Sequence, residues 1–234
     1  MTWLKVCGTT NLHDAQLTVA AGANALGFVF APSSRRIEIA DAAEIIAKLP
    51  NGIEKIGVFV NETPARVAEV TRRIGLTGVQ LHGDEPADGM PDFRRALGER
   101  KIIKTLQAHD ILQPGREWLA EYLSAHGSID AILLDSGSAQ QRGGTGIPFA
   151  WEEVLPLAAA IREAMPLIIA GGLNAENVAE ALRRFDSWGV DVVSGVERKP
   201  GKKDEARLRN FVAAVRQTRA SVKQRERWKK PAAT

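Results

Sequence analysis

Eight short apolar runs alternate along this chain with amphipathic stretches of helical length, and this alternation constrains the fold more than any other feature of the sequence. Apolar runs that recur at the spacing of βα units predict parallel strands joined by helices. The expected strands are 4–7, 25–30, 55–60, 78–81, 102–105, 131–134, 167–170 and 191–193. The clearest helical stretches between them are 11–21, 40–48, 64–74 and 177–185.

Eight such units predict an α/β fold, a single-domain (β/α)8 TIM barrel. A doubly wound open sheet would also give apolar strands separated by helices, but the count of eight favours the barrel. A chain of 234 residues with 44% hydrophobic residues is long enough to bury a large core. We assign residues 1–218 to the barrel. The weakest unit follows residue 105, because 107–116 contains Pro and Gly and is typical of a loop.

Two of the expected strands run directly into glycine near the C-terminal end of the chain. The seventh leads into Gly171 and Gly172, and the eighth leads into Ser194 and Gly195. Bare backbone N–H groups ahead of a helix bind phosphate, and (β/α)8 barrels commonly hold phosphate after strands 7 and 8. We therefore predict one phosphate site shared by both turns, and we expect Asn174 to cap the helix after the first of them.

The net charge of +3 is unevenly placed, because residues 219–230 are strongly basic. We expect the last helix over 204–216, followed by a basic C-terminal extension, 219–234, that is partly disordered and solvated. No apolar stretch has the length of a membrane span, and the first residues lack a signal-peptide pattern, so a cytoplasmic location is expected. The single cysteine, Cys7, excludes an internal disulfide and a zinc cluster built on cysteines.

Functional side chains of a parallel barrel lie at the carboxyl ends of its strands, and in this sequence those positions are polar. Lys5 and Cys7 end the first run, Gln80 and His82 end the fourth, and Asp135 follows the sixth. The loops add Arg35 and Arg36 after the second strand and the glycine-rich stretch 143–146 after the sixth.

These segments together resemble the phosphoribosylanthranilate isomerase family of the tryptophan pathway. The resemblance covers most of the chain, in order, and leaves out only the basic tail. One departure is Ile37, where the family often has an aromatic residue. The matching motifs are 5–8 (Lys-Val-Cys-Gly), 34–36 (Ser-Arg-Arg), 79–83 (Val-Gln-Leu-His-Gly), 133–135 (Leu-Leu-Asp), 143–146 (Gly-Gly-Thr-Gly), 170–173 (Ala-Gly-Gly-Leu) and 194–204 (Ser-Gly-Val-Glu to Asp).

The resemblance implies an Amadori rearrangement of N-(5-phosphoribosyl)anthranilate to 1-(2-carboxyphenylamino)-1-deoxyribulose 5-phosphate. An acid protonates the ring oxygen and a base removes the proton from C2, so neither a metal nor a cofactor is expected. By resemblance, Asp135 is the acid and Cys7 the base. The expected substrate-binding residues are Arg36 for the carboxylate, Gln80, His82 and Gly146 around the substrate, and Gly171, Gly172, Ser194 and Gly195 for the phosphate.

The ordinary pKa values of aspartate and cysteine do not suit a general acid and a general base at neutral pH. Aspartate titrates near roughly 3.9 and cysteine near roughly 8.5, so Asp135 needs desolvation or a nearby anion and Cys7 needs a nearby cation, either Lys5 or Arg36. Each residue also has a simpler interpretation: Cys7 as inert core, Asp135 as a turn cap and His82 as a structural group. Arg35 is expected to be a solvated loop cation.

Three alternative functions differ in what they require at the strand ends. Another phosphosugar barrel, such as an indole-glycerol-phosphate synthase, would show a lysine and glutamates there. A bifunctional ribotide isomerase would favour two aspartates in place of the cysteine and aspartate. A noncatalytic polyanion-binding protein would depend on the tail and on low salt. The favoured partner is a small phosphoribosyl substrate, with no nucleic acid, no membrane and a monomeric or homodimeric state.

Overall fold

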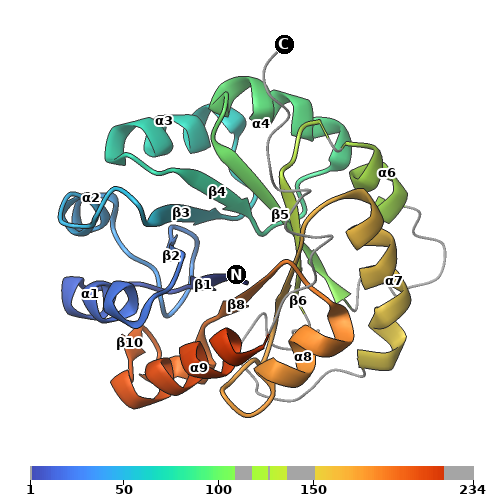
Figure 1. Ribbon diagram of the computed structural model, residues 1–234. Coiled ribbons are helices and arrows are strands. Elements are labelled where there is room, and N and C mark those ends of the chain that lie inside the picture. Colours follow the sequence, from blue (N-terminus) through green and yellow to red (C-terminus); the bar gives the residue numbers. More distant parts are fainter. Residues whose placement is uncertain (1, 109–117, 126, 136–150, 219–234) are drawn as a thin grey trace.

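The computed structural model describes residues 2–108, 118–125, 127–135 and 151–218. Eight parallel strands hydrogen-bond in chain order, and β8 closes the sheet by pairing with β1. Figure 1 shows the helices arranged around this closed sheet, so the predicted single-domain (β/α)8 barrel is confirmed. The strands are β1 (Trp3–Val6), β2 (Ala25–Val29), β3 (Glu54–Phe59), β4 (Gly78–Leu81), β5 (Lys101–Gln107), β6 (Ala131–Asp135), β7 (Leu167–Ala170) and β8 (Gly189–Val192).

Three of the described helices begin at a side-chain cap. Asn11, Thr63 and Asp204 each accept a hydrogen bond from a backbone N–H in the first turn of the helix that follows. The described helices are α1 (Leu12–Ala21), α2 (Ile39–Ile46), α3 (Pro64–Ile74), α4 (Met90–Leu97), α6 (Trp118–Ser124), α7 (Trp151–Ala164), α8 (Val178–Phe185) and α9 (Glu205–Gln217), with the short 3-10 turns η1 (Ala87–Gly89) and η2 (Ser194–Val196).

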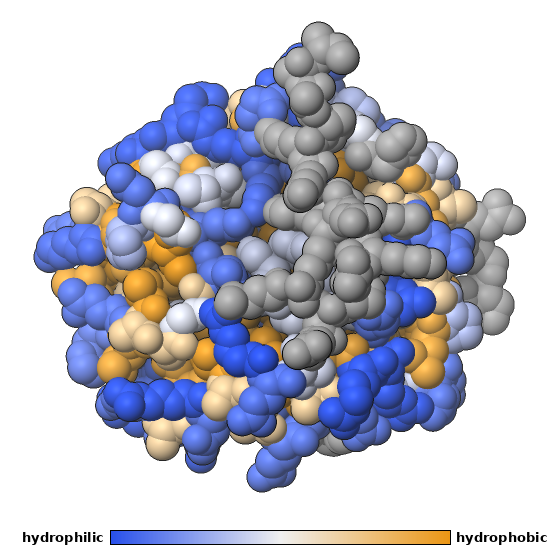
Figure 2. Space-filling view, in the orientation of Figure 1, coloured by the Kyte–Doolittle hydropathy of each residue, from blue (hydrophilic) through white to orange (hydrophobic). Residues whose placement is uncertain are grey.

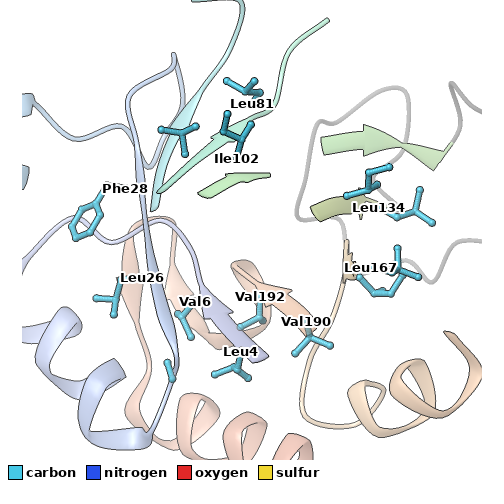
Figure 3. Close-up of a cluster of buried hydrophobic side chains, with 14 of the residues drawn as sticks. Leu4, Val6, Leu26, Phe28, Leu81, Ile102, Leu134, Leu167, Val190 and Val192 are labelled. Atoms are coloured by element: carbon cyan, nitrogen blue, oxygen red, sulfur yellow. The ribbon is translucent and has the colours of Figure 1, made fainter. Parts of the chain in front are cut away.

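The strands carry apolar side chains on both faces, as parallel strands covered by helices require. One face packs against the helices, and Figure 3 shows Leu4, Leu26 and Val190 between their strands and the neighbouring helices. The other face fills the interior of the barrel with a smaller apolar cluster that includes Trp3, stacked on Trp188 with ring centroids 5.0 Å apart. Apolar burial on both faces therefore stabilises the closed sheet.

Two details after the last strands differ from the sequence-based predictions. Helix α8 begins at Val178 with Asn177 at the N-cap position, whereas Asn174 caps the preceding turn, where its Oδ1 accepts from the N–H groups of Glu176 and Asn177 at 2.8 and 3.1 Å. After β8 the chain forms η2 and a hairpin of β9 (Glu197–Lys199) and β10 (Lys202–Lys203) before α9 begins. The second glycine turn thus leads into a hairpin first, and only then into the predicted last helix.

Three expectations lie outside the described residues: most of the weak segment 107–116, the glycine-rich loop 143–146 and the basic extension 219–234. Strand β5 itself is longer than predicted and continues to Gln107. Among the described helices, none combines the length and the apolar character needed to cross a membrane. In the view of Figure 2, hydrophilic residues make up much of the outer rim of the described part of the molecule.

Candidate functional site

A cavity of about 360 Å³ opens at the carboxyl ends of the barrel strands. Its walls come from β1, β2, β3, β4, β6, β7 and β8 and the loops that follow them, so residues far apart in the sequence meet there. Of the predicted site residues, the cavity is lined by Cys7, Gln80, His82, Asp135, Gly171, Gly172 and Ser194. Arg36 and Gly195 are not among its lining residues, and Gly146 lies outside the described part of the chain.

Cys7 directly follows β1, and only 5% of the residue is exposed. The neighbouring strand leaves room for its sulfur because position 27 is glycine: a Cβ on Gly27 would lie 2.4 Å from the Cys7 Sγ. The turn after the cysteine uses Gly8 at φ +77°, a conformation that other residues rarely adopt. The sequence did not single out Gly27, although glycine inside a strand is the usual sign of a close approach.

Lys5 and Asp191 form a buried ion pair beside Cys7. They are directly paired on β1 and β8, and the Lys5 Nζ lies 3.0 Å from an Asp191 carboxylate oxygen. The charge of the Lys5 ammonium also favours the thiolate form of Cys7, which lies two residues further along the chain, and this lowers the pKa of the thiol. Burial nevertheless raises the pKa of the Cys7 thiol, because the opposing attraction of Lys5 is smaller. Asp191 was not predicted, and its signal was a carboxylate inside an apolar run.

Asp135 is the last residue of β6, where it pairs in register with Gln107 of β5 and Ala170 of β7. Only 6% of the residue is exposed, and it lines the cavity. The strand therefore delivers a carboxyl to the cavity that also contains the Cys7 thiol. These are the two groups that an acid and base mechanism needs in one space.

Gln80 and His82 form one wall of the cavity together with two residues of β5. The Gln80 amide nitrogen lies 2.9 Å from His82 Nδ1 and 3.0 Å from the Thr105 hydroxyl, and Gln107 approaches the other ring nitrogen at 3.3 Å. The Gln80 carbonyl oxygen is buried and has no partner among the described residues. This wall orients the histidine ring, and the described residues leave the buried carbonyl oxygen of Gln80 as an unused acceptor.

The loop that carries His82 is held by a buried carboxylate that the sequence did not reveal. Glu85 accepts from the backbone N–H groups of Asn61 and Gly83 and from the Lys104 ammonium, whose Nζ is 2.7 Å away. Tyr122 of α6 donates to the Glu85 carbonyl. Burial lowers the pKa of Lys104, although Glu85 favours its charged form. These contacts join the loops that follow β3 and β4.

The two arginines of the second loop have different surroundings, and Arg35 is less exposed than the sequence-based prediction had it. Arg35, expected to be solvated, lines the cavity, and its guanidinium binds Glu197 through Nε and Nη2 at 3.0 and 2.7 Å. Arg36, expected at the substrate, pairs with Glu38 at 3.2 Å, and 52% of its side chain is exposed. Buried Glu197, from the distant hairpin, pairs with Arg35, whereas Arg36 pairs with exposed Glu38 instead.

The same hairpin also supports the end of β1. The Lys203 ammonium donates to the Cys7 carbonyl oxygen at 2.5 Å and to Glu197 at 3.1 Å, and its backbone N–H donates to Asp14 of α1 at 2.9 Å. Lys203 is 2% exposed, and burial lowers its pKa although Glu197 opposes this. Both hairpin residues lie within the motif 194–204, but the sequence alone did not reveal their contacts with Cys7 and Arg35.

The two glycine turns lie against each other at the rim of the cavity. Gly171 and Gly172 have φ values of 91° and 62°, both in the left-handed region that favours glycine. A Cβ on Gly195 would lie 1.9 Å from the Leu173 carbonyl oxygen, so only glycine allows the turns to approach this closely. The predicted neighbourhood of the two turns is therefore present, and Ser194 joins them at the cavity wall.

Comparison of the sequence with known proteins points to one family. The family model for N-(5'-phosphoribosyl)anthranilate (PRA) isomerase matches residues 4–214. The protein so named from Geobacter sulfurreducens is 45% identical over 215 residues, which cover 91% of this chain and 97% of that protein. The one from Rubrobacter xylanophilus is 40% identical over 218 residues, 92% of this chain and 100% of its own.

Solved structures agree with the sequence comparison. The phosphoribosyl anthranilate isomerase of Thermotoga maritima is 36% identical, and the match covers 93% of this chain and all of that one with a TM-score of 0.79. A second isomerase structure, in complex with reduced 1-(o-carboxyphenylamino)-1-deoxyribulose 5-phosphate, matches at 35% identity over 93% of this chain and all of that one, with a TM-score of 0.75. This chain belongs to the N-(5'-phosphoribosyl)anthranilate isomerase family.

Proposed function

We propose that this chain catalyses the Amadori rearrangement of N-(5-phosphoribosyl)anthranilate to 1-(2-carboxyphenylamino)-1-deoxyribulose 5-phosphate, a step of tryptophan biosynthesis. The observation that carries the proposal is that Asp135 and Cys7 line the same cavity, with the two glycine turns at its rim. This combination fits a phosphorylated sugar that must gain a proton at one atom and lose a proton at another. An enzyme of this pathway is expected to act in the cytoplasm.

In the first step Asp135, entering the reaction protonated, donates its proton to the furanose ring oxygen. The bond between that oxygen and C1 breaks, and the nitrogen lone pair forms the C1–N double bond of an iminium ion. The product of this step is an open-chain cation. Asp135 becomes a carboxylate and is thereby available to return a proton later in the cycle.

In the second step the Cys7 thiolate removes the proton from C2, and the electron pair of that bond moves to neutralise the iminium nitrogen. The resulting enolamine tautomerises to the ketone. Burial raises the pKa of the free thiol, so the thiolate needs a further cation beyond Lys5. The iminium supplies that positive charge within the cavity, because an adjacent cation favours the charged form of a thiol.

Backbone groups are proposed to hold the phosphate. The N–H groups of Gly172, Ser194 and Gly195 belong to two turns in direct contact, and the left-handed conformation of Gly172 permits the close approach of an anion. Arg36 is proposed to bind the anthranilate carboxylate after exchanging its exposed partner Glu38 for the substrate. Gln80 and His82 are proposed to contact the substrate from the β4 wall, and Gly146 from the loop after β6.

The test is an assay of the purified chain with freshly made phosphoribosylanthranilate, followed by the loss of anthranilate fluorescence. The related aminoimidazole ribotide, tested in parallel, distinguishes a bifunctional isomerase. An inactive wild-type protein would contradict the proposal. Light scattering on the same sample decides between the monomer and the homodimer; one solved relative is described as dimeric.

Asp135→Asn is the matched variant for the acid, because the amide keeps the shape and cannot donate the required proton. We expect turnover to fall about 10²–10⁴-fold. Binding of a reduced, nonreactive product analogue should be largely retained. If the variant loses affinity for that analogue but turns over normally at saturation, Asp135 is a binding residue and not the acid.

A further inference from the structure

One ammonium group in the barrel interior serves two partners. The Lys5 Nζ lies 3.0 Å from an Asp191 carboxylate oxygen, and its charge also acts on the thiol of Cys7, two residues further along the chain. Lys5 is fully buried and Asp191 is 5% exposed, so water does not take the place of either interaction. Asp191 lines the same cavity as Cys7, on the strand adjacent to β1.

We propose that Asp191 and the Cys7 sulfur compete for the Lys5 ammonium, which makes Asp191 a positioning residue that sets how strongly the thiol holds its proton. A carboxylate bound to Lys5 holds the ammonium and partly cancels its charge. The thiolate then gains less from Lys5 than it would gain from a free cation. Without the Asp191 carboxylate, the Lys5 ammonium should stabilise the Cys7 thiolate more strongly.

The other groups around Cys7 have less effect on the charge of the thiol than Lys5 and Asp191. From β10, Lys203 contacts the cysteine carbonyl and weakly favours the thiolate, but its own charge is bound to Glu197. From β2, Gly27 faces the Cys7 sulfur and has no side chain that could carry a charge. Asp135 and Arg35 line the same cavity from β6 and the second loop, and Arg35 is also bound to Glu197.

The competition has a consequence for the reaction that rests on the proposed function. A base that holds its proton more strongly removes a C–H proton more effectively, provided that it is deprotonated when the substrate arrives. Asp191 strengthens the base, whereas Lys5 and the iminium favour its deprotonated form. Lys5 and Asp191 therefore act in opposite directions. Asp191 makes the thiolate a stronger base, and Lys5 increases the fraction of enzyme in which Cys7 is deprotonated.

The test uses the fact that Cys7 is the only cysteine of the chain, so every thiol signal reports this residue. The rate of alkylation by iodoacetamide at neutral pH, and the ultraviolet absorbance of the thiolate as pH rises, are measured without substrate. Asp191→Asn should increase the alkylation rate about tenfold, which corresponds to one unit of thiol pKa. Lys5→Met should slow it, because Lys5 acts on the thiol more strongly than Asp191 does.

Glu85→Gln is the matched control. It removes the carboxylate of another buried lysine pair, Lys104–Glu85 at 2.7 Å, and should destabilise the fold by a similar mechanism while leaving the thiol titration unchanged. Asp191→Glu, which keeps the charge, should bring the alkylation rate back toward wild type. Near-ultraviolet circular dichroism shows which variants are folded.

The proposal is overturned if folded Asp191→Asn alkylates no faster than wild type, or if Glu85→Gln accelerates alkylation equally. If Asp191→Asn does not fold, Lys5→Met decides alone: an unchanged or faster rate overturns the proposal. A shifted thiol titration in a chain without isomerase activity would contradict the proposed function and leave this inference standing. The two failures are therefore distinguishable.

Discussion

The interior of the barrel has two ends made by the same strands, and they differ in chemistry. Toward the amino ends of the strands, Trp3 and Trp188 stack within an apolar cluster that includes Ile56 and Ile168. Toward the carboxyl ends, a cavity is lined by Cys7 and by polar side chains that include Gln80, Asp135 and Asp191. Strand β1 passes through both, with Trp3, then Lys5, then Cys7, all on one face. One end of the barrel therefore provides packing, and the other provides chemistry.

The strongest test of this division is Cys7→Ser at the carboxyl end. A hydroxyl is a far poorer base than a thiol at neutral pH, so turnover should fall about 10²–10⁴-fold. The fold should remain, because serine is no larger than cysteine and fits beside Gly27. Steady-state kinetics and a thermal melt measure the two properties separately. Near-normal turnover would remove Cys7 from the mechanism.

Trp3→Ala tests the amino end. Loss of a large buried aromatic side chain and of its stacking on Trp188 should cost about 3–5 kcal/mol of unfolding free energy. Chemical denaturation measures this. The Michaelis constant and turnover of the protein that remains folded should stay near wild type. A large loss of turnover in folded protein would mean that the two ends are coupled and that the division between them is wrong.

The arginine pair sharpens the comparison within the carboxyl end. Arg36→Met should raise the Michaelis constant through loss of a carboxylate contact worth about 1.5–3 kcal/mol. Arg35→Met should instead lower the melting temperature, because it removes a bidentate partner of buried Glu197. Kinetics and melting curves for both variants separate these roles. The reverse pattern would identify Arg35 as the carboxylate-binding residue.

The smallest expected effect is that of Ser194→Ala at the second glycine turn. If backbone groups hold the phosphate, loss of one hydroxyl bond worth about 0.5–1.5 kcal/mol should weaken substrate binding only slightly. Gly172→Val is the comparison variant, and it should weaken binding much more, because its φ of 62° is unfavourable for valine. The inhibition constant of inorganic phosphate, which competes with the substrate, measures the affinity of each variant for the phosphate group. Equal losses in both variants would contradict binding through the backbone.

Much of the architecture was predictable because it depends on local patterns. Apolar runs placed all eight strands to within a few residues, and the caps Asn11, Thr63 and Asp204 lie where helices begin. Burial on both faces of a parallel strand leaves a continuous apolar run, which a single sequence displays directly. The positions of Cys7 and Asp135 at strand ends followed from the same pattern, and the family resemblance supplied their expected roles.

The contacts that set the behaviour of the site were decided only by the tertiary structure. Lys5 meets Asp191 and Arg35 meets Glu197 across separations of 186 and 162 residues. The hairpin of β9 and β10 was missed because its strands are short and rich in lysine. Lys203 is buried through contacts with Glu197, the Cys7 carbonyl and Asp14, and the sequence does not display them. A charged residue shows its type in the sequence but not its partner. The partner depends on barrel closure, which brings the last strand beside the first.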